Sequence, residues 1–297
     1  MGEINRLKKK RKAVILVHNY QTPEIQDIAD YLGDSLGLSR IASQTRAKVI
    51  IFCGVHFMAE TASILCPDKK VLMPDINAGC PMADMITKEG LRTLKREHPH
   101  ATVVGYVNTS ADVKTELDIC CTSTNAIKII NSLKNSKEII FVPDKYLADY
   151  ASRKTGRKLI AWDGYCPTHV KILPEHILKQ KRLHPGAKII VHPECTPPVI
   201  DLADEALSTE GMCKYAKLTD AYEIIVGTEI GLLYRLRKEN PKKKFYPASE
   251  EATCPNMKMN TLEKVLWSLE DMKYEIKVPE DIRVKAIKAV DRMCRIG

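Results

Sequence analysis

NAGCP around Cys80, GYCPT around Cys166 and ATCPN around Cys254 are three short segments in which a cysteine stands directly before a proline. The three cysteines lie 86 and 88 residues apart, and strand-like runs such as IIFCG, IIFVP and IIVGT precede them. A helical stretch follows each cysteine. Self-similarity at a fixed period indicates one supersecondary unit used several times. The sequence therefore predicts three repeated units, each ending in a cysteine, and three thiolates that can meet at one point.

Other polar residues keep nearly the same period. Three sets, given in chain order, are His18, Tyr106 and His192 at the ends of strand-like runs; Tyr20, Asn108 and Glu194 two residues later; and Ser35, Ser123 and Ser208 before helical stretches. Chance could supply one such set, but the agreement of several supports a true repeat.

The predicted fold class is α/β, with three repeated three-layer α/β/α domains around a pseudo-threefold axis. Strands alternate with helices, and many strands are nearly continuous apolar runs, which is typical of parallel sheets covered on both faces. We expect domains at residues 1–86, 87–172 and 173–260, with helices in 261–297 packing back on the first. Ligands of open parallel sheets bind beyond the carboxyl ends of the strands. The polar sets should therefore line one central cavity.

Composition excludes several classes of function. The chain of 297 residues has a formal net charge of +9, but only 6% of its residues are aromatic and no nucleic-acid docking motif is present. We therefore expect no nucleic-acid partner and a positive field that attracts small anionic substrates. No apolar run approaches the roughly 20 residues that span a bilayer, and the run AVILV is too short for a signal-peptide core. A cytoplasmic protein without membrane association is expected.

The cysteines favour an iron–sulfur cluster. Ten are present without any C-x-x-C, so zinc-ribbon and thioredoxin-like motifs are missing. Cys80, Cys166 and Cys254 match three corners of a cubane cluster, which usually takes four cysteines. The remaining iron would be open and could act as a Lewis acid. Zinc on the same cysteines is the alternative, although its ligands usually arrive as close pairs.

The polar sets favour acid–base catalysis and anion binding. His18, Tyr20, His192 and Glu194 supply proton donors and acceptors, although a single histidine at a strand end is often structural. The serines, with Thr209 beside Ser208, suit helix N-caps, and the same groups can bind phosphate or carboxylate. No P-loop or G-x-G-x-x-G motif supports a nucleotide cofactor.

The motifs HNYQTPEIQDIADYLGDSL, GYVNTSADVKTELDICCTSTNA, VHPEC and CPNMKMNTLE resemble those of the quinolinate synthase family in order and spacing, from residue 14 to 270. The resemblance implies three α/β/α domains and a [4Fe–4S] cluster held by Cys80, Cys166 and Cys254. It implies a transferase that condenses iminoaspartate with dihydroxyacetone phosphate to quinolinate, releasing phosphate and two waters, in de novo NAD biosynthesis. An iminoaspartate-producing enzyme would be a functional partner.

The resemblance also assigns roles to single residues. Tyr20 matches an acid–base tyrosine, and Glu194 with His192 matches a proton-transferring pair. Positions that hold substrate carboxylates and phosphate are matched by His18, Ser35, Tyr106, Asn108, Ser123 and Thr209. Two alternatives stay open: another iron–sulfur hydro-lyase, and a non-catalytic iron–sulfur sensor that would not need the His, Tyr and Glu residues.

Overall fold

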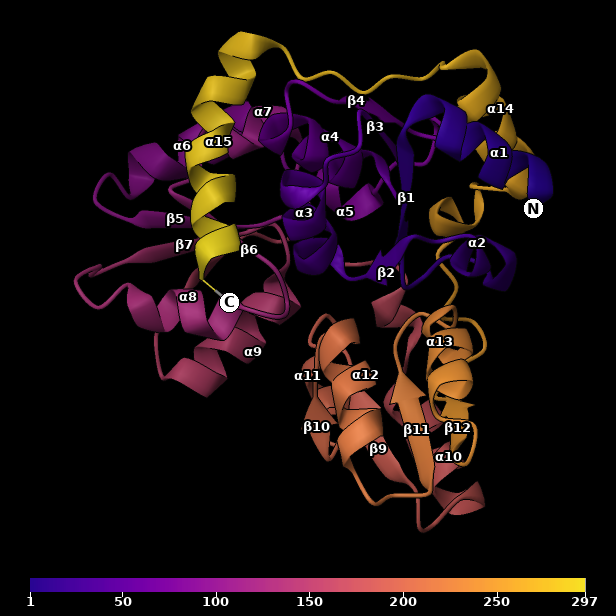
Figure 1. The fold of residues 1–297 in the computed structure, drawn as a ribbon. Helices are drawn as coiled ribbons and strands as arrows, with labels where there is room; N and C mark the ends of the chain where they lie inside the picture. Colours follow the sequence, from indigo (N-terminus) through magenta and orange to yellow (C-terminus); the bar gives the residue numbers. More distant parts are fainter. Residues whose placement is uncertain (297) are drawn as a thin grey trace.

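Three four-stranded parallel sheets follow one another along the chain in the computed structural model, which describes residues 1–296 (Figure 1). The strands, in sheet order, are β2 (Tyr31–Gly33), β1 (Ala13–His18), β3 (Val49–Cys53) and β4 (Lys70–Leu72); β6 (Ile119–Cys121), β5 (Thr102–Tyr106), β7 (Ile139–Val142) and β8 (Ile160–Ala161); and β10 (Glu205–Ala206), β9 (Lys188–Val191), β11 (Glu223–Gly227) and β12 (Lys244–Pro247). The second strand in sequence lies at one edge of each sheet, so the order is the same three times. This confirms the predicted α/β class with three repeated units.

Helices connect these strands. In the first unit they are α1 (Gly2–Arg11), α2 (Pro23–Asp27), α3 (Ser35–Gln44), α4 (His56–Leu65) and α5 (Pro81–Asp84); in the second α6 (Lys88–Glu97), α7 (Ala111–Lys114), α8 (Ala126–Ser132), α9 (Lys145–Thr155) and the 3-10 helix η1 (His169–Lys171); in the third α10 (Pro174–Leu183), α11 (Pro197–Ile200), α12 (Thr209–Leu218), α13 (Leu232–Glu239) and the 3-10 helix η2 (Asn256–Lys258). The chain ends with α14 (Leu262–Asp271) and α15 (Glu280–Arg295). Within residues 1–296, none of these helices has the length and hydropathy that a bilayer crossing requires.

Both faces of the first sheet are buried, as the apolar runs predicted. Along β1, Ile15 and Val17 pack in a cluster that includes residues of α1 and α14. Val14 and Leu16 point the other way, into the main core with α3 and α4. Successive strand residues point to opposite faces, so a strand covered on both faces must be apolar throughout.

An aspartate hydrogen bond repeats in all three units. Oδ2 of each aspartate accepts a backbone N–H from the first strand of its unit at 2.8 Å, and its own backbone N–H donates to the carbonyl of that same residue. The pairs are Asp30 with Ile15, Asp118 with Val103, and Asp204 with Ile189. The repeat therefore extends to single side chains that the sequence analysis did not identify.

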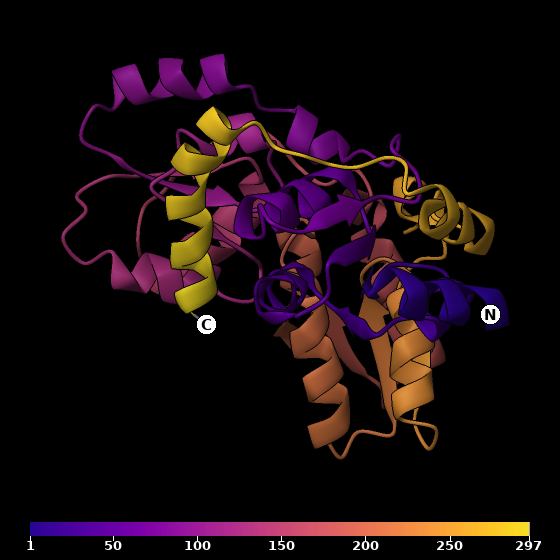
Figure 2. The same ribbon diagram turned by 45° about the horizontal axis from the view of Figure 1, so that its top comes forward.

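Helix α15 lies across the first two units and apart from the third, and α14 lies beside α1 of the first unit (Figures 1 and 2). Helix α14 packs against α1, whereas α15 packs against α3 and α4 of the first unit and against α7 and β6 of the second. The predicted segment 261–297 therefore contacts the second unit as well as the first, and its residue 297 lies outside the described residues. The domain boundaries at 86 and 172 stay a prediction.

Candidate active site and metal centre

A cavity of about 200 Å³ receives side chains from all three units. The predicted site residues that line it are His18, Tyr20, Ser35, Cys80, Tyr106, Asn108, Ser123, Cys166, His192, Glu194, Thr209 and Cys254. Ser208 does not line this cavity and faces a neighbouring hollow beside α12. The structure thus brings together all but one of these residues.

Strand topology explains why they meet. His18 is the last residue of β1, Tyr106 is the last of β5, and His192 directly follows β9. These strands occupy the same place in their sheets, beside the point where the strand order reverses. Such switch points open a crevice at the carboxyl ends of parallel strands. The three crevices contribute to one cavity.

His18 and His192 make the same turn in their units. Nδ1 of His18 accepts the backbone N–H of Tyr20 at 3.2 Å, and Nδ1 of His192 accepts that of Glu194 at 3.3 Å. A nitrogen that accepts carries no proton, so each ring is neutral with its proton on Nε2. Burial lowers the pKa of both imidazoles to about 3, although the Glu194 charge opposes this. Both are therefore neutral donors at neutral pH, and Nε2 of His192 lies 3.2 Å from Ser123 Oγ.

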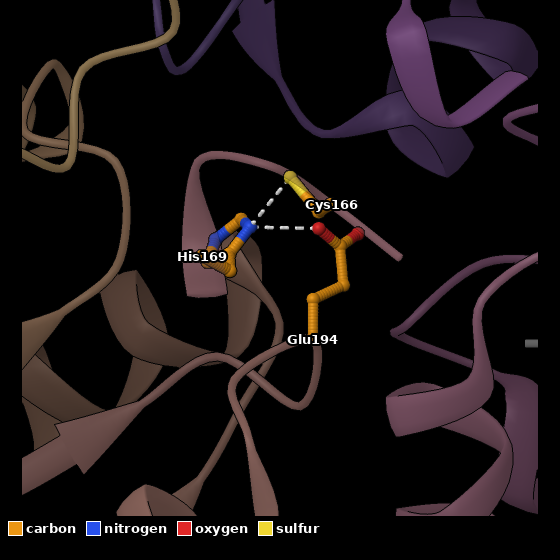
Figure 3. Close-up of side chains that lie close together, drawn as sticks. All are labelled: Cys166, His169 and Glu194. Atoms are coloured by element: carbon orange, nitrogen blue, oxygen red, sulfur yellow. Dashed lines mark hydrogen bonds and ion pairs between the residues drawn. The ribbon is translucent and has the colours of Figure 1, made fainter. Parts of the chain in front are cut away.

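Glu194 is a buried carboxylate at the centre of the polar contacts. Its Oε2 lies 2.7 Å from Nδ1 of His169 (Figure 3). Its Oε1 accepts a hydrogen bond from the Tyr106 hydroxyl. Burial alone would raise the pKa of Glu194, but the facing His169 and the hydrogen bonds from His169 and Tyr106 lower it below its ordinary value. Glu194 is therefore ionised and can accept a proton.

Tyr20 is connected to Glu194 through two residues that the sequence analysis missed, His169 and Thr228. The Tyr20 hydroxyl lies 2.7 Å from Thr228 Oγ1, which lies 3.0 Å from Nε2 of His169. Burial and the Glu194 charge raise the pKa of Tyr20 well above 10, and the Thr228 hydrogen bond only partly opposes this. A protonated phenol is thus linked to a carboxylate. The one sequence signal for His169 was its place three residues after Cys166.

The serine set has mixed roles. The Ser208 hydroxyl accepts the Gly211 N–H at 3.2 Å and so caps α12, whereas Asp34, not Ser35, caps α3. Ser208 is therefore a helix N-cap, whereas Ser35 and Ser123 line the cavity. Among the described residues, the buried Oδ1 of Asn108 has no hydrogen-bond partner.

The three cysteine loops line the same cavity. Two of them are joined directly, because Asn256 Nδ2, two residues after Cys254, donates to the carbonyl of Gly79, just before Cys80, at 2.8 Å. Burial raises the pKa of all three thiols, that of Cys80 to about 12. Such thiols ionise when a metal replaces their protons, and thiolates select soft metals and iron–sulfur clusters. The donor set fits a metal cofactor.

A second set of donors overlaps the first. One sulfur, nitrogen or oxygen atom from each of Cys166, His169 and Glu194 lies within 4.8 Å of the others (Figure 3). His169 Nδ1 lies 3.1 Å from the Cys166 sulfur as well as close to Glu194. This mixed set is also consistent with a metal ion.

Comparisons with known proteins identify the family of this chain. The family described as Quinolinate synthetase A protein matches residues 2–295. Relatives named quinolinate synthase include one from Dehalococcoides mccartyi (strain CBDB1), 58% identical over 99% of this chain and 97% of its own length. Those from Methanosarcina barkeri and Thermodesulfovibrio yellowstonii are 57% and 55% identical, over 99% and 98% of this chain and 96% of their own lengths. The chain therefore belongs to the quinolinate synthetase A family of enzymes.

Proposed function

We propose that this enzyme condenses iminoaspartate with dihydroxyacetone phosphate to form quinolinate, phosphate and two waters, in de novo NAD biosynthesis. The observation that carries the proposal is one cavity, lined by a cysteine from each unit and by the linked Tyr20 and Glu194. We further propose that Cys80, Cys166 and Cys254 hold a [4Fe–4S] cluster. With three protein ligands, such a cluster would supply an open iron that polarises a substrate oxygen as a Lewis acid.

The chain's own residues would move the protons. The steps are phosphate elimination, a carbonyl shift, imine formation and dehydration, and these need a proton donor and an acceptor but no redox cofactor. Tyr20 is the donor, because its pKa keeps it protonated. Thr228 and His169 can pass a proton between the phenol and the Glu194 carboxylate. The neutral His192 stands beside the same carboxylate, its Nδ1 4.0 Å from Oε2.

Anion binding falls to neutral donors at the other positions of the cavity. Ser35, Ser123, Asn108 and Thr209 offer hydroxyl and amide groups, and His18 offers its Nε2 proton. Both proposed substrates are anions, which the net charge of +9 attracts. Exclusion of water from the cavity by the bound substrates would protect the hydrolysable imine. An iminoaspartate-producing enzyme would supply this substrate.

Analysis of metal and product tests the proposal. Protein purified without oxygen should contain about four iron and about four sulfide per chain and form quinolinate from the two substrates. Each of Cys80→Ala, Cys166→Ala and Cys254→Ala should lose the cluster. Zinc that disappears with His169→Ala but survives Cys80→Ala would instead assign the metal to the mixed donor set.

The two alternatives give other results. A cluster without quinolinate formation, but with dehydration of another hydroxy acid, would indicate a different hydro-lyase. A sensor would keep its cluster and its response after Tyr20 and Glu194 are replaced, because it needs neither group.

A further inference from the structure

An ion pair between a buried glutamate and a partly buried lysine beside the cavity has no role in the proposed proton transfers. Nζ of Lys258 lies 2.8 Å from Oε1 of Glu229, and the Glu229 side chain is 0% exposed. Glu229 follows Thr228 at the end of β11, and Lys258 ends η2, just after Cys254. The pair thus lies between a proposed cluster ligand and the proposed proton path.

Glu229 holds the backbone of the Cys254 loop. Its Oε1 accepts the Cys254 N–H at 3.2 Å, and its Oε2 accepts the N–H of Gly231 at 2.8 Å. Hydrogen bonds to an ionised acceptor are stronger and shorter than neutral ones. One carboxylate therefore fixes the position at which the Cys254 side chain leaves the backbone.

Lys258 contacts the turn that contains Tyr20, whereas Glu229 contacts the Cys254 loop. Its Nζ donates to the backbone carbonyl of Tyr20. The two neighbouring carbonyls, of Asn19 and Gln21, accept from Nε2 of Gln26 at 3.2 and 2.8 Å. Gln26 belongs to the first unit, like Tyr20, whereas Lys258 fixes the turn from the third.

Gly231 shows how closely these groups pack. A Cβ placed on it would lie 2.7 Å from the Tyr20 carbonyl oxygen and 2.8 Å from both Glu229 Oε2 and Lys258 Nζ. Those distances are too short for a Cβ atom. The backbone at position 231 can therefore lie this close to Tyr20, Glu229 and Lys258 only because the residue is glycine. Gly231 therefore packs directly against both the ion pair and the Tyr20 turn, with no room between them for another atom.

We propose that Glu229 and Lys258 are positioning residues that fix the Cys254 ligand loop and the Tyr20 turn relative to each other. The role of the two groups they position rests on the proposed function. A buried ion pair is weak evidence for stability, since an apolar pair of similar volume often serves as well. An apolar pair, however, could not provide directional hydrogen bonds to two separate loops, and the ion pair does.

Three variants separate positioning from folding. Lys258→Met or Glu229→Gln alone changes one partner, and a charge left buried without its partner is strongly destabilising. The double variant Glu229→Gln, Lys258→Met removes both charges and the donor to the Tyr20 carbonyl, and it leaves one neutral oxygen where the carboxylate accepted the N–H groups of both Cys254 and Gly231. The matched control is Glu116→Gln, Lys95→Met, because that pair joins at 3.0 Å in the second unit and neither residue lines the cavity.

The measurements are thermal unfolding, the rate of cluster loss to a chelator, and kcat and KM per loaded cluster. For the double variant we expect unfolding near the wild-type temperature, cluster loss about tenfold faster, and kcat at least about tenfold lower with KM within about threefold. The control should match the wild type in every measurement. A well-folded double variant with wild-type kcat and cluster lifetime would overturn the proposal.

Two further results stay informative. If the double variant does not fold, Gly231→Ala keeps both charges but crowds the ion pair and the Tyr20 carbonyl together, and wild-type kcat in that variant would also refute the proposal. If the wild type itself makes no quinolinate, the proposed function fails. The rate of cluster loss still decides whether the pair positions Cys254.

Discussion

Environment, more than residue type, sets the chemistry of the side chains in the cavity. Tyr20 and Glu194 belong to one hydrogen-bonded network. Burial keeps the Tyr20 phenol protonated, whereas the hydrogen bonds that the Glu194 carboxylate accepts keep this carboxylate ionised. Burial keeps His18 and His192 neutral, and in both rings Nδ1 accepts a backbone N–H. A pair of groups whose pKa values are driven apart is what acid–base catalysis requires.

Tyr20→Phe removes one hydroxyl and keeps the ring. We expect the cluster to be retained and kcat to fall by about 10²- to 10⁴-fold, because the proton donor is lost. Quinolinate formation at saturating substrate, together with iron content, checks this. Tyr31→Phe is the control, since Tyr31 is 45% exposed in β2. Near-normal turnover of the Tyr20 variant would remove this residue from the mechanism.

The neutral histidines predict acid sensitivity. His18 and His192 bind a proton near pH 6.5 when unfolded but only near pH 3 when folded, so the unfolded state binds more protons between these values. The free energy of unfolding therefore has its full value above pH 6.5. Below pH 6.5 it decreases, by up to about 1.4 kcal/mol per pH unit for each histidine.

Urea unfolding of the wild type and His18→Gln at pH 7.5 and pH 5 tests this. The variant should lose less stability between the two pH values, because one titrating group is gone. His100→Gln, at an exposed histidine, should behave as the wild type. Equal losses in the wild type and the His18 variant would show that His18 is protonated in the folded state.

At the scale of elements, equivalent positions of the repeat have diverged. Three aspartates make the same contact with the first strand of each unit. The serine set instead splits: Ser208 caps α12 and contacts Thr124 Oγ1 at 2.9 Å, which in turn donates to Asp34 at 2.6 Å. One hydrogen-bonded chain thus joins a residue from each unit near the cavity.

Ser208→Ala should destabilise the fold by about 1 kcal/mol, because the N-cap of α12 is lost. The KM values should stay within about twofold, since Ser208 does not line the cavity. Thr261→Ala, which removes the N-cap of α14, is the matched control for stability. A large rise in KM without loss of stability would return Ser208 to the substrate site.

At the scale of the whole molecule, helix α15 joins the first two units. It packs on α3, α4, α7 and β6, and Asn125 Nδ2 donates to the Met293 carbonyl at 3.0 Å. The cavity in turn depends on all three units, because each provides one cysteine and one residue at a strand end. The site therefore exists only when the units are assembled.

Met293→Ala tests this joining role. Met293 is 0% exposed, so its truncation leaves a cavity between α15 and the units and should cost about 2–5 kcal/mol. Val284→Ala in the same helix is the control, because Val284 is 44% exposed and should cost little. Urea unfolding measures both. An equal, small effect would mean that α15 adds little to the assembly.

The sequence alone predicted the three units, their parallel sheets and the strand-end residues, because period, apolar runs and cysteine spacing are local signals written along the chain. It did not predict that α15 contacts the second unit, that Asp34 caps α3, or that Ser208 lines a neighbouring hollow in place of the cavity. The periodic sets of polar residues also do not include four residues of the site: His169, Thr228, Glu229 and Lys258. Their contacts join segments far apart in sequence, and such contacts arise only from the packing of whole units against one another.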